Sequence, residues 1–176
     1  MSVPSAQWRR LRERSNFACE FCGVSESDAG GLLTVDHFRP RTQGGTDDLD
    51  NLVYCCIRCN QYKQDYWPSN RQQPALWNPR DSDVASHFVE LENGWLHPLT
   101  PAGAFTLSRL RLNRPPLVAW RLQRRYRQEQ ARLLANYREL VHLLERLRQQ
   151  ESRLLQEQQK LLFEQRALLR LLVKRS

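Results

Sequence analysis

The alternation of apolar and polar residues divides the chain into a mixed N-terminal part and a long helical C-terminal part. Residues 5–15 place apolar side chains on one side of an arginine-rich segment, which predicts a short helix. The runs 32–38 and 52–54 are rich in β-branched, aromatic and other apolar residues and predict two short strands. A helix is expected next, from the second cysteine pair through Tyr66. Two strands followed by a helix indicate a small α+β domain.

The middle of the chain, residues 67–116, has a different composition. It is rich in proline and aromatic residues, and the runs 87–91 and 94–96 predict two more short strands joined by the turn at 92–94. We interpret residues 67–116 as a satellite segment packed on residues 1–66. Its three tryptophans are expected in the core of the segment: Trp67, Trp77 and Trp95.

Residues 117–176 are almost free of glycine and proline and predict a single helical arm, helix-favouring to Lys174. Leucines recur every seven residues, which is typical of a coiled coil or a helical hairpin. The main row is Leu133, Leu140, Leu147, Leu154, Leu161 and Leu168, and a second row contains Leu134, Val141, Leu155, Leu162 and Leu169. The arm is therefore expected to join a homodimer or a partner protein, although the other seam position becomes polar at Glu151, Gln158 and Gln165.

Charge is distributed unevenly along the chain. Residues 109–176 contain 17 Lys and Arg against 6 Glu, a net charge of +11, and the remaining 10 basic and 13 acidic side chains leave residues 1–108 at −3. A basic surface of this kind attracts nucleic acid by releasing counterions, and a solvated arginine-rich helix face is the alternative. No apolar stretch is long enough to cross a membrane, so a cytoplasmic protein without a membrane partner is expected.

Four of the five cysteines form two Cys-x-x-Cys pairs, Cys19/Cys22 and Cys56/Cys59. This spacing allows both sulfurs of each pair to bind one ion, and four thiolates suit a closed, tetrahedral, structural Zn²⁺ site. Cys55 could replace Cys56, but the two-residue spacing favours Cys56.

The segment between Cys19 and Lys63 contains Val35-Asp36-His37-Phe38-Arg39-Pro40, then Gly44-Gly45, Asn51-Leu52 and Cys56-x-x-Cys59-Asn60-x-x-Lys63. In order, spacing and residue type it closely resembles the HNH endonuclease family, in the branch with four zinc cysteines. The resemblance covers about 45 residues and implies a ββα-metal core. It departs from the eponymous pattern because Asn60 stands in the last position instead of histidine.

This resemblance implies a role for each matching residue. His37 corresponds to the general base that takes a proton from water, and Asp36 and Asn60 to the residues that hold one catalytic divalent ion. Oxygen donors of this kind suit Mg²⁺ or Mn²⁺. Asn51 corresponds to the central asparagine, which fixes the loop that bears the base. Lys63, Arg39 and Arg41 are candidate contacts to nucleic-acid phosphates.

Together these expectations describe a metal-dependent endonuclease that hydrolyses phosphodiester bonds of DNA, with an HNH core at 1–66, a satellite segment at 67–116 and a basic helical arm at 117–176. A zinc-knuckle nucleic-acid-binding or assembly module without intrinsic cleavage is the alternative. The complete set Asp36, His37, Asn51 and Asn60 argues against a decayed site.

Overall fold

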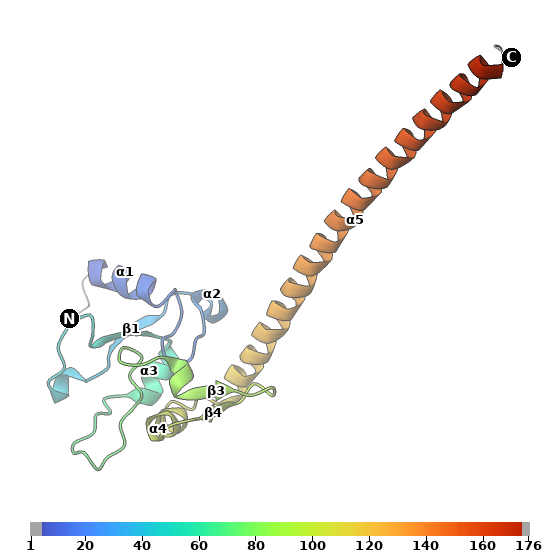
Figure 1. Cartoon of the computed structure of the whole chain (residues 1–176). Coiled ribbons are helices and arrows are strands. Elements are labelled where there is room, and N and C mark those ends of the chain that lie inside the picture. The colour runs from blue at the N-terminus through green and yellow to red at the C-terminus, as the bar shows by residue number, and fades with distance from the viewer. Residues whose placement is uncertain (1–4, 174–176) are drawn as a thin grey trace. The chain divides into compact units, whose positions relative to one another are not determined.

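The computed structural model describes residues 5–173, with the side chains of 6–167 and of Arg170. The expected leucines Leu168 and Leu169 and the helix end at Lys174 therefore lie outside the described side chains and residues. The chain forms two units, residues 1–123 and 124–176. The first unit combines helices with two small antiparallel sheets, and the long helix α5 begins in it (Figure 1). This is the expected α+β class.

The centre of the first unit is a pair of antiparallel strands followed by a helix. Strand β1 (Thr34–His37) pairs with β2 (Leu52–Cys55) so that His37 lies opposite Leu52, and α3 (Ile57–Lys63) follows β2 directly. Every residue of β2 is buried, because helix α1 (Ser5–Arg14) packs against it. A strand covered on both faces has no polar side, which explains its continuous apolar sequence.

Helix α3 ends three residues earlier than expected. Gln64 has a φ angle of 53° and a ψ angle of −153°, which a helix cannot continue through. The backbone N–H of Gln64 donates to the carbonyl of Asn60 and closes the last turn. The predicted extension to Tyr66 is therefore wrong, because α3 stops at Lys63.

The satellite segment contains an antiparallel strand pair: β3 (Phe88–Glu90) lies within the expected run 87–91, whereas β4 (Leu96–Pro98) begins at the last residue of the expected run 94–96. It also contains helix α4 (Pro101–Arg109), which the sequence analysis missed. Thr100 caps α4 by accepting a hydrogen bond from the N–H of Gly103, and proline at the first helical position has no N–H to leave unsatisfied. Short segments complete the unit: α2 (Glu26–Ala29), η1 (Arg41–Gln43) and η2 (Val84–Ser86).

The tryptophans of this segment lie in different environments. Trp77 is buried, and its backbone N–H donates to the hydroxyl of Thr106 over 2.7 Å. Trp67 is partly buried and meets the ring of Phe38 edge-on at 6.0 Å. Trp95 is 51% exposed, so its expected place in the core is wrong. The core runs continuously from the cysteines through Trp77 to the start of α5, which joins the segment to the strands.

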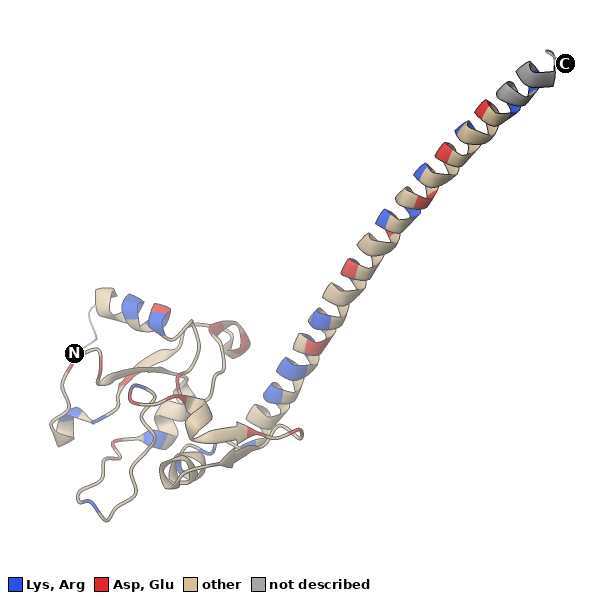
Figure 2. Cartoon of the chain, in the orientation of Figure 1, with Lys and Arg blue, Asp and Glu red and all other residues tan. Residues whose placement is uncertain are grey.

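Helix α5 (Pro115–Val173) contains Arg124–Val173 of the second unit. The leucines of its seven-residue row from Leu133 to Leu161 are each more than half exposed. Basic and acidic residues are interspersed along the described part of α5, and basic residues predominate near its start (Figure 2). None of the helices in the described part of the chain combines the length and the apolar character required to cross a bilayer.

Candidate functional site

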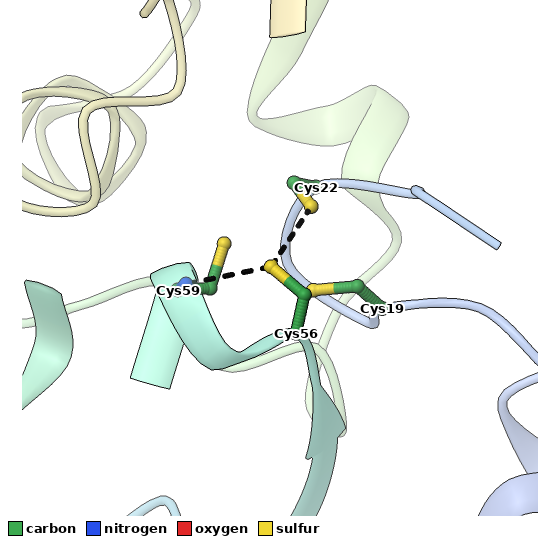
Figure 3. A group of neighbouring side chains, drawn as sticks. All are labelled: Cys19, Cys22, Cys56 and Cys59. Atoms are coloured by element: carbon green, nitrogen blue, oxygen red, sulfur yellow. Dashed lines mark hydrogen bonds between the residues drawn. The ribbon is translucent and has the colours of Figure 1, made fainter. Parts of the chain in front are cut away.

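The two Cys-x-x-Cys pairs come together in the core of the first unit (Figure 3). The four sulfur atoms of Cys19, Cys22, Cys56 and Cys59 all lie within 4.8 Å of one another, and those of Cys22 and Cys56 are 3.8 Å apart. A tetrahedral Zn²⁺ ion with Zn–S bonds of about 2.3 Å requires sulfurs about 3.8 Å apart. The cluster therefore has the size and the donor set of a structural zinc site.

Local backbone structure places these sulfurs. After Cys22 the chain turns at Gly23, whose φ angle is 78° and whose N–H donates to the carbonyl of Cys19 over 2.8 Å. Cys56 is the N-cap of α3, where its sulfur accepts a hydrogen bond from the N–H of Cys59. The second pair thus fixes the start of the helix that carries Asn60.

The electrostatics of the cluster also suit a cation. Hydrogen bonds among the sulfurs, that of Cys19 foremost, shift two thiol pKa values in opposite directions: the pKa of Cys56 falls and that of Cys59 rises. Metal binding requires deprotonated thiols, so an ion at this position would hold all four as thiolates. The guanidinium of Arg114, about 4 Å from the sulfurs of Cys56 and Cys59, adds positive charge beside them.

Cys55 is not part of the cluster. Its side chain is buried beside the hydroxyl of Thr34, and burial raises the pKa of its thiol well above the ordinary value. Because neighbouring residues of a strand point to opposite sides, Cys55 and Cys56 diverge where β2 ends. The structure groups Cys56 with the other three cysteines, in agreement with the spacing argument.

Asp36 and Lys63 form a buried pair between β1 and α3. The ammonium of Lys63 lies 2.9 Å from Oδ2 of Asp36 and donates to the backbone carbonyl of His37 over 2.7 Å. Lys63 is completely buried, whereas the Asp36 side chain is 18% exposed. Oδ2 is itself buried, and its contact with Lys63 is an ion pair without the geometry of a directed hydrogen bond. Lys63 therefore ties β1 to α3, in place of the surface phosphate contact expected from the sequence.

His37 lies at the end of β1, with its side chain 19% exposed. Its Nε2 atom is 2.7 Å from a carboxylate oxygen of Asp47, and Arg41 binds the same carboxylate. The sequence analysis did not single out Asp47, because three aspartates at 47, 48 and 50 share one loop and nothing local distinguishes them. Arg41, a predicted phosphate contact, is engaged by Asp47 in this arrangement.

Asn51 connects both ends of the loop that follows His37. Its side-chain oxygen accepts a hydrogen bond from the N–H of Arg39 over 2.8 Å, and its amide nitrogen donates to the carbonyls of Arg39 (3.1 Å) and Thr46 (2.8 Å). Gly45 is required here, because a Cβ atom would lie 1.8 Å from the carbonyl oxygen of Arg39. These bonds give Asn51 the geometry of a residue that fixes the loop.

Asn60 and Arg39 are the remaining predicted site residues. Asn60 is partly exposed on α3, one turn before Lys63, and three or four residues along a helix share a face. Asn60 thus lies on the side of α3 that meets Asp36 through Lys63. Arg39 is exposed, with its guanidinium 5.3 Å from the centre of the Trp67 ring.

Comparison with known proteins gives a match to one family of endonucleases and to one relative that is described as a transcription factor. Residues 19–65 match the HNH endonuclease family. The chain is 31% identical over 71 residues to "Transcription factor fil1" of Schizosaccharomyces pombe, a match that covers 40% of this chain. The chain spans only 12% of the length of that relative. No solved structure matches the chain.

The family match begins at the first clustered cysteine and ends two residues after Lys63, so it encloses the strand pair, α3 and all four sulfurs. The HNH endonuclease model therefore matches the whole of this ββα unit, and the four cysteines fit a zinc-binding variant of the HNH domain.

Proposed function

We propose that the chain is a metal-dependent endonuclease that hydrolyses phosphodiester bonds of DNA. The observation that carries the proposal is the placement of Asp36 and His37 at the end of β1, against the helix that bears Asn60, with Lys63 joining the two elements. In this proposal His37 and Asp36 supply a base and an oxygen donor from β1, and Asn60 supplies a second oxygen donor from the helix that Lys63 joins to that strand.

His37 is the general base in this proposal. Hydrolysis needs a group that takes a proton from the attacking water, and a neutral imidazole, with an ordinary pKa near 6.5, does so at physiological pH. The His37 side chain is partly open to solvent, so water reaches it, and its backbone is held through the carbonyl bonded to Lys63.

Asp36 and Asn60 would hold the divalent ion, Mg²⁺ or Mn²⁺. The donor set fits such an ion: the side chains of Asp36 and Asn60 are partly exposed, and both offer oxygen, the donor that these ions prefer. A bound divalent ion supplies positive charge against the phosphate as negative charge develops on it. Because Lys63 already offsets the charge of Asp36, these residues alone would hold the ion weakly, and the negative charge of a substrate phosphate would strengthen its binding.

The surrounding residues hold these groups and bind the substrate. Asn51 fixes the loop after His37 through its bonds to Arg39 and Thr46. Arg39, exposed beside the loop, is the better candidate for a phosphate contact, because Arg41 is paired with Asp47.

A second reading is a nucleic-acid-binding module without cleavage. The transcription-factor description of the relative favours it, as does the cation already present at Asp36 in the form of Lys63. In this reading the clustered cysteines stabilise a binding domain and His37 has no chemical role.

The basic arm supplies a binding surface in either reading. Arg132, Arg146, Arg153 and Lys160 lie on a seven-residue row, which Glu139 interrupts, one position before the main leucine row, so they form a separate face about 100° around the helix. We expect this row to meet the DNA backbone. Replacing all four with glutamine should reduce the slope of log affinity against log salt by about 3 to 4. An unchanged slope would contradict the assignment.

The leucine row provides a surface for assembly, with a second copy of the chain as the simplest occupant. Monomeric proteins rarely expose so continuous an apolar stripe. Light scattering on the full chain and on a Leu140→Glu, Leu147→Glu, Leu154→Glu variant tests this: a dimer that becomes a monomer supports it, and two monomers of equal mass contradict it.

Cleavage of supercoiled plasmid by the purified protein tests the main proposal, with Mg²⁺, Mn²⁺ or EDTA present. Nicking that requires the ion and disappears in His37→Ala, but persists in the control His97→Ala, would establish the enzyme and its base. Each preparation should contain one zinc ion per chain. Cys55→Ser should keep this zinc content, whereas Cys59→Ser should lose it. Plasmid binding without cleavage by such zinc-loaded protein would support the binding module.

A further inference from the structure

We propose that Asp47 is the positioning residue that fixes the tautomer and orientation of the His37 imidazole, with Arg41 locking Asp47 in place. The catalytic part of this inference rests on the proposed function, but the positioning itself does not. Neither the family match nor the HNH motif between Cys19 and Lys63 assigns a role to Asp47.

The tautomer follows from hydrogen-bond chemistry. Neutral imidazole has a single N–H, and a carboxylate only accepts hydrogen bonds. Because Nε2 of His37 is 2.7 Å from Oδ1 of Asp47, the hydrogen is on Nε2. The lone pair is then on Nδ1, which becomes the nitrogen that accepts a proton. The longer contact of 3.3 Å between Nε of Arg41 and Nε2 of His37 is secondary, because Nε of Arg41 also donates to Asp47 over 2.8 Å.

Arg41 holds Asp47 as a carboxylate. Its guanidinium donates from Nε and Nη2 to both carboxylate oxygens, the fork geometry that fixes a carboxylate in direction as well as in position. Hydrogen bonds from Arg41, and then from His37, hold the pKa of Asp47 below its ordinary value. Asp47 therefore remains an acceptor for His37 throughout the neutral range.

The loop gives this pair a fixed base. Thr46, directly before Asp47, has its carbonyl held by the amide of Asn51, and the turn before it closes at Gly44, whose N–H donates to the carbonyl of Arg41. Both partners of the ion pair thus come from one short loop that Asn51 anchors to β2. The anchored loop holds the carboxylate against a ring on β1, which is the arrangement in which a partner residue orients a base.

Nuclear magnetic resonance of protein labelled with ¹⁵N in its histidines tests the positioning without any substrate. At about pH 8, well above the ordinary histidine pKa near 6.5, the ring nitrogens report the tautomer directly. His37→Ala identifies the signals. We expect His37 in a single form, with hydrogen on Nε2, in the wild type and in Asp48→Ala, and a mixture of tautomers in Asp47→Ala. Asp48 is the matched control, because it is an exposed carboxylate of the same loop that binds Thr46 and not His37.

Plasmid cleavage supplies the catalytic readout. If His37 is the base, Asp47→Ala should lower kcat by about 10- to 100-fold, by analogy with the partners that orient metal-bound histidines, with KM nearly unchanged. Asp48→Ala should retain wild-type activity. An Asp47→Ala protein that keeps one His37 tautomer overturns the inference, whatever its activity. A wild-type protein that shows the single tautomer, lost in Asp47→Ala, but cuts no DNA would refute the proposed function and leave the positioning role intact.

Discussion

Replacing Asn51 should destabilise the loop after β1 by a predictable amount. Its side chain makes three hydrogen bonds, one accepted from the N–H of Arg39 and two donated to the carbonyls of Arg39 and Thr46. A net contribution of about 1 kcal/mol for each, reduced because the partly exposed site admits water, predicts a loss of about 2 to 3 kcal/mol for Asn51→Ala. Urea unfolding of the zinc-loaded protein measures this loss.

Asn51→Asp is the sharper comparison, because it keeps the volume and the acceptor for Arg39. Its second oxygen, however, would face the carbonyl oxygens of Arg39 and Thr46, where two donated bonds are lost and a negative charge meets two partial negative charges. We expect Asn51→Asp to be at least as unstable as Asn51→Ala at pH 7. Hydrogen exchange should show faster exchange of the Arg39 amide in the alanine variant than in the aspartate variant. An aspartate variant as stable as the wild type would refute this account of the loop.

Three further changes test other contacts of the first unit. Gly45→Ala places a Cβ 1.8 Å from a backbone oxygen and should lower the free energy of unfolding by about 2 kcal/mol or more. Gly31→Ala, with open space around the added Cβ, should leave the stability unchanged. Equal thermal stabilities of the two variants would contradict the argument. Thr106→Val leaves the buried N–H of a tryptophan unpaired and should cost about 1 to 3 kcal/mol in urea unfolding. Arg12 donates to Glu26 and lowers its pKa, so the stability that Glu26 adds is present at neutral pH and is lost as pH falls through that lowered pKa. The difference between wild type and Glu26→Gln should therefore vanish in acid, and a constant difference would exclude the charged pair as its cause.

The features that the sequence predicts are those with local patterns. The strands at Thr34–His37 and Leu52–Cys55 are continuous runs of suitable residues, and the cysteine spacing singles out Cys56 over its neighbour Cys55. Helix α4 was not predicted from the proline-rich composition of this segment, because proline is rare inside helices. Pro101 in fact occupies the first helical position, with Thr100 as the cap.

Such local patterns do not predict contacts between residues that are far apart in the sequence. Lys63 is a lysine one turn past Asn60, and the sequence alone favours an exposed role for it. Its burial depends on Asp36, 27 residues earlier, which offers an opposite charge once β1 packs on α3. The contact of Asp47 is equally unpredictable from the sequence, because only the turn at Gly44 and the hydrogen bonds of Asn51 decide which of the neighbouring aspartates reaches His37.

The clustered cysteines also act on the unfolded chain. An ion bound by Cys22 and Cys56 closes a loop that contains β1, the following loop and β2, and therefore His37 and Asn51 as well. Such a cross-link removes conformational freedom from the denatured chain, at a gain that grows only slowly with loop length. Zinc supply then sets how much of this domain is folded at all. A shortage of zinc would then remove the folded domain while leaving His37 and Asn51 chemically unchanged.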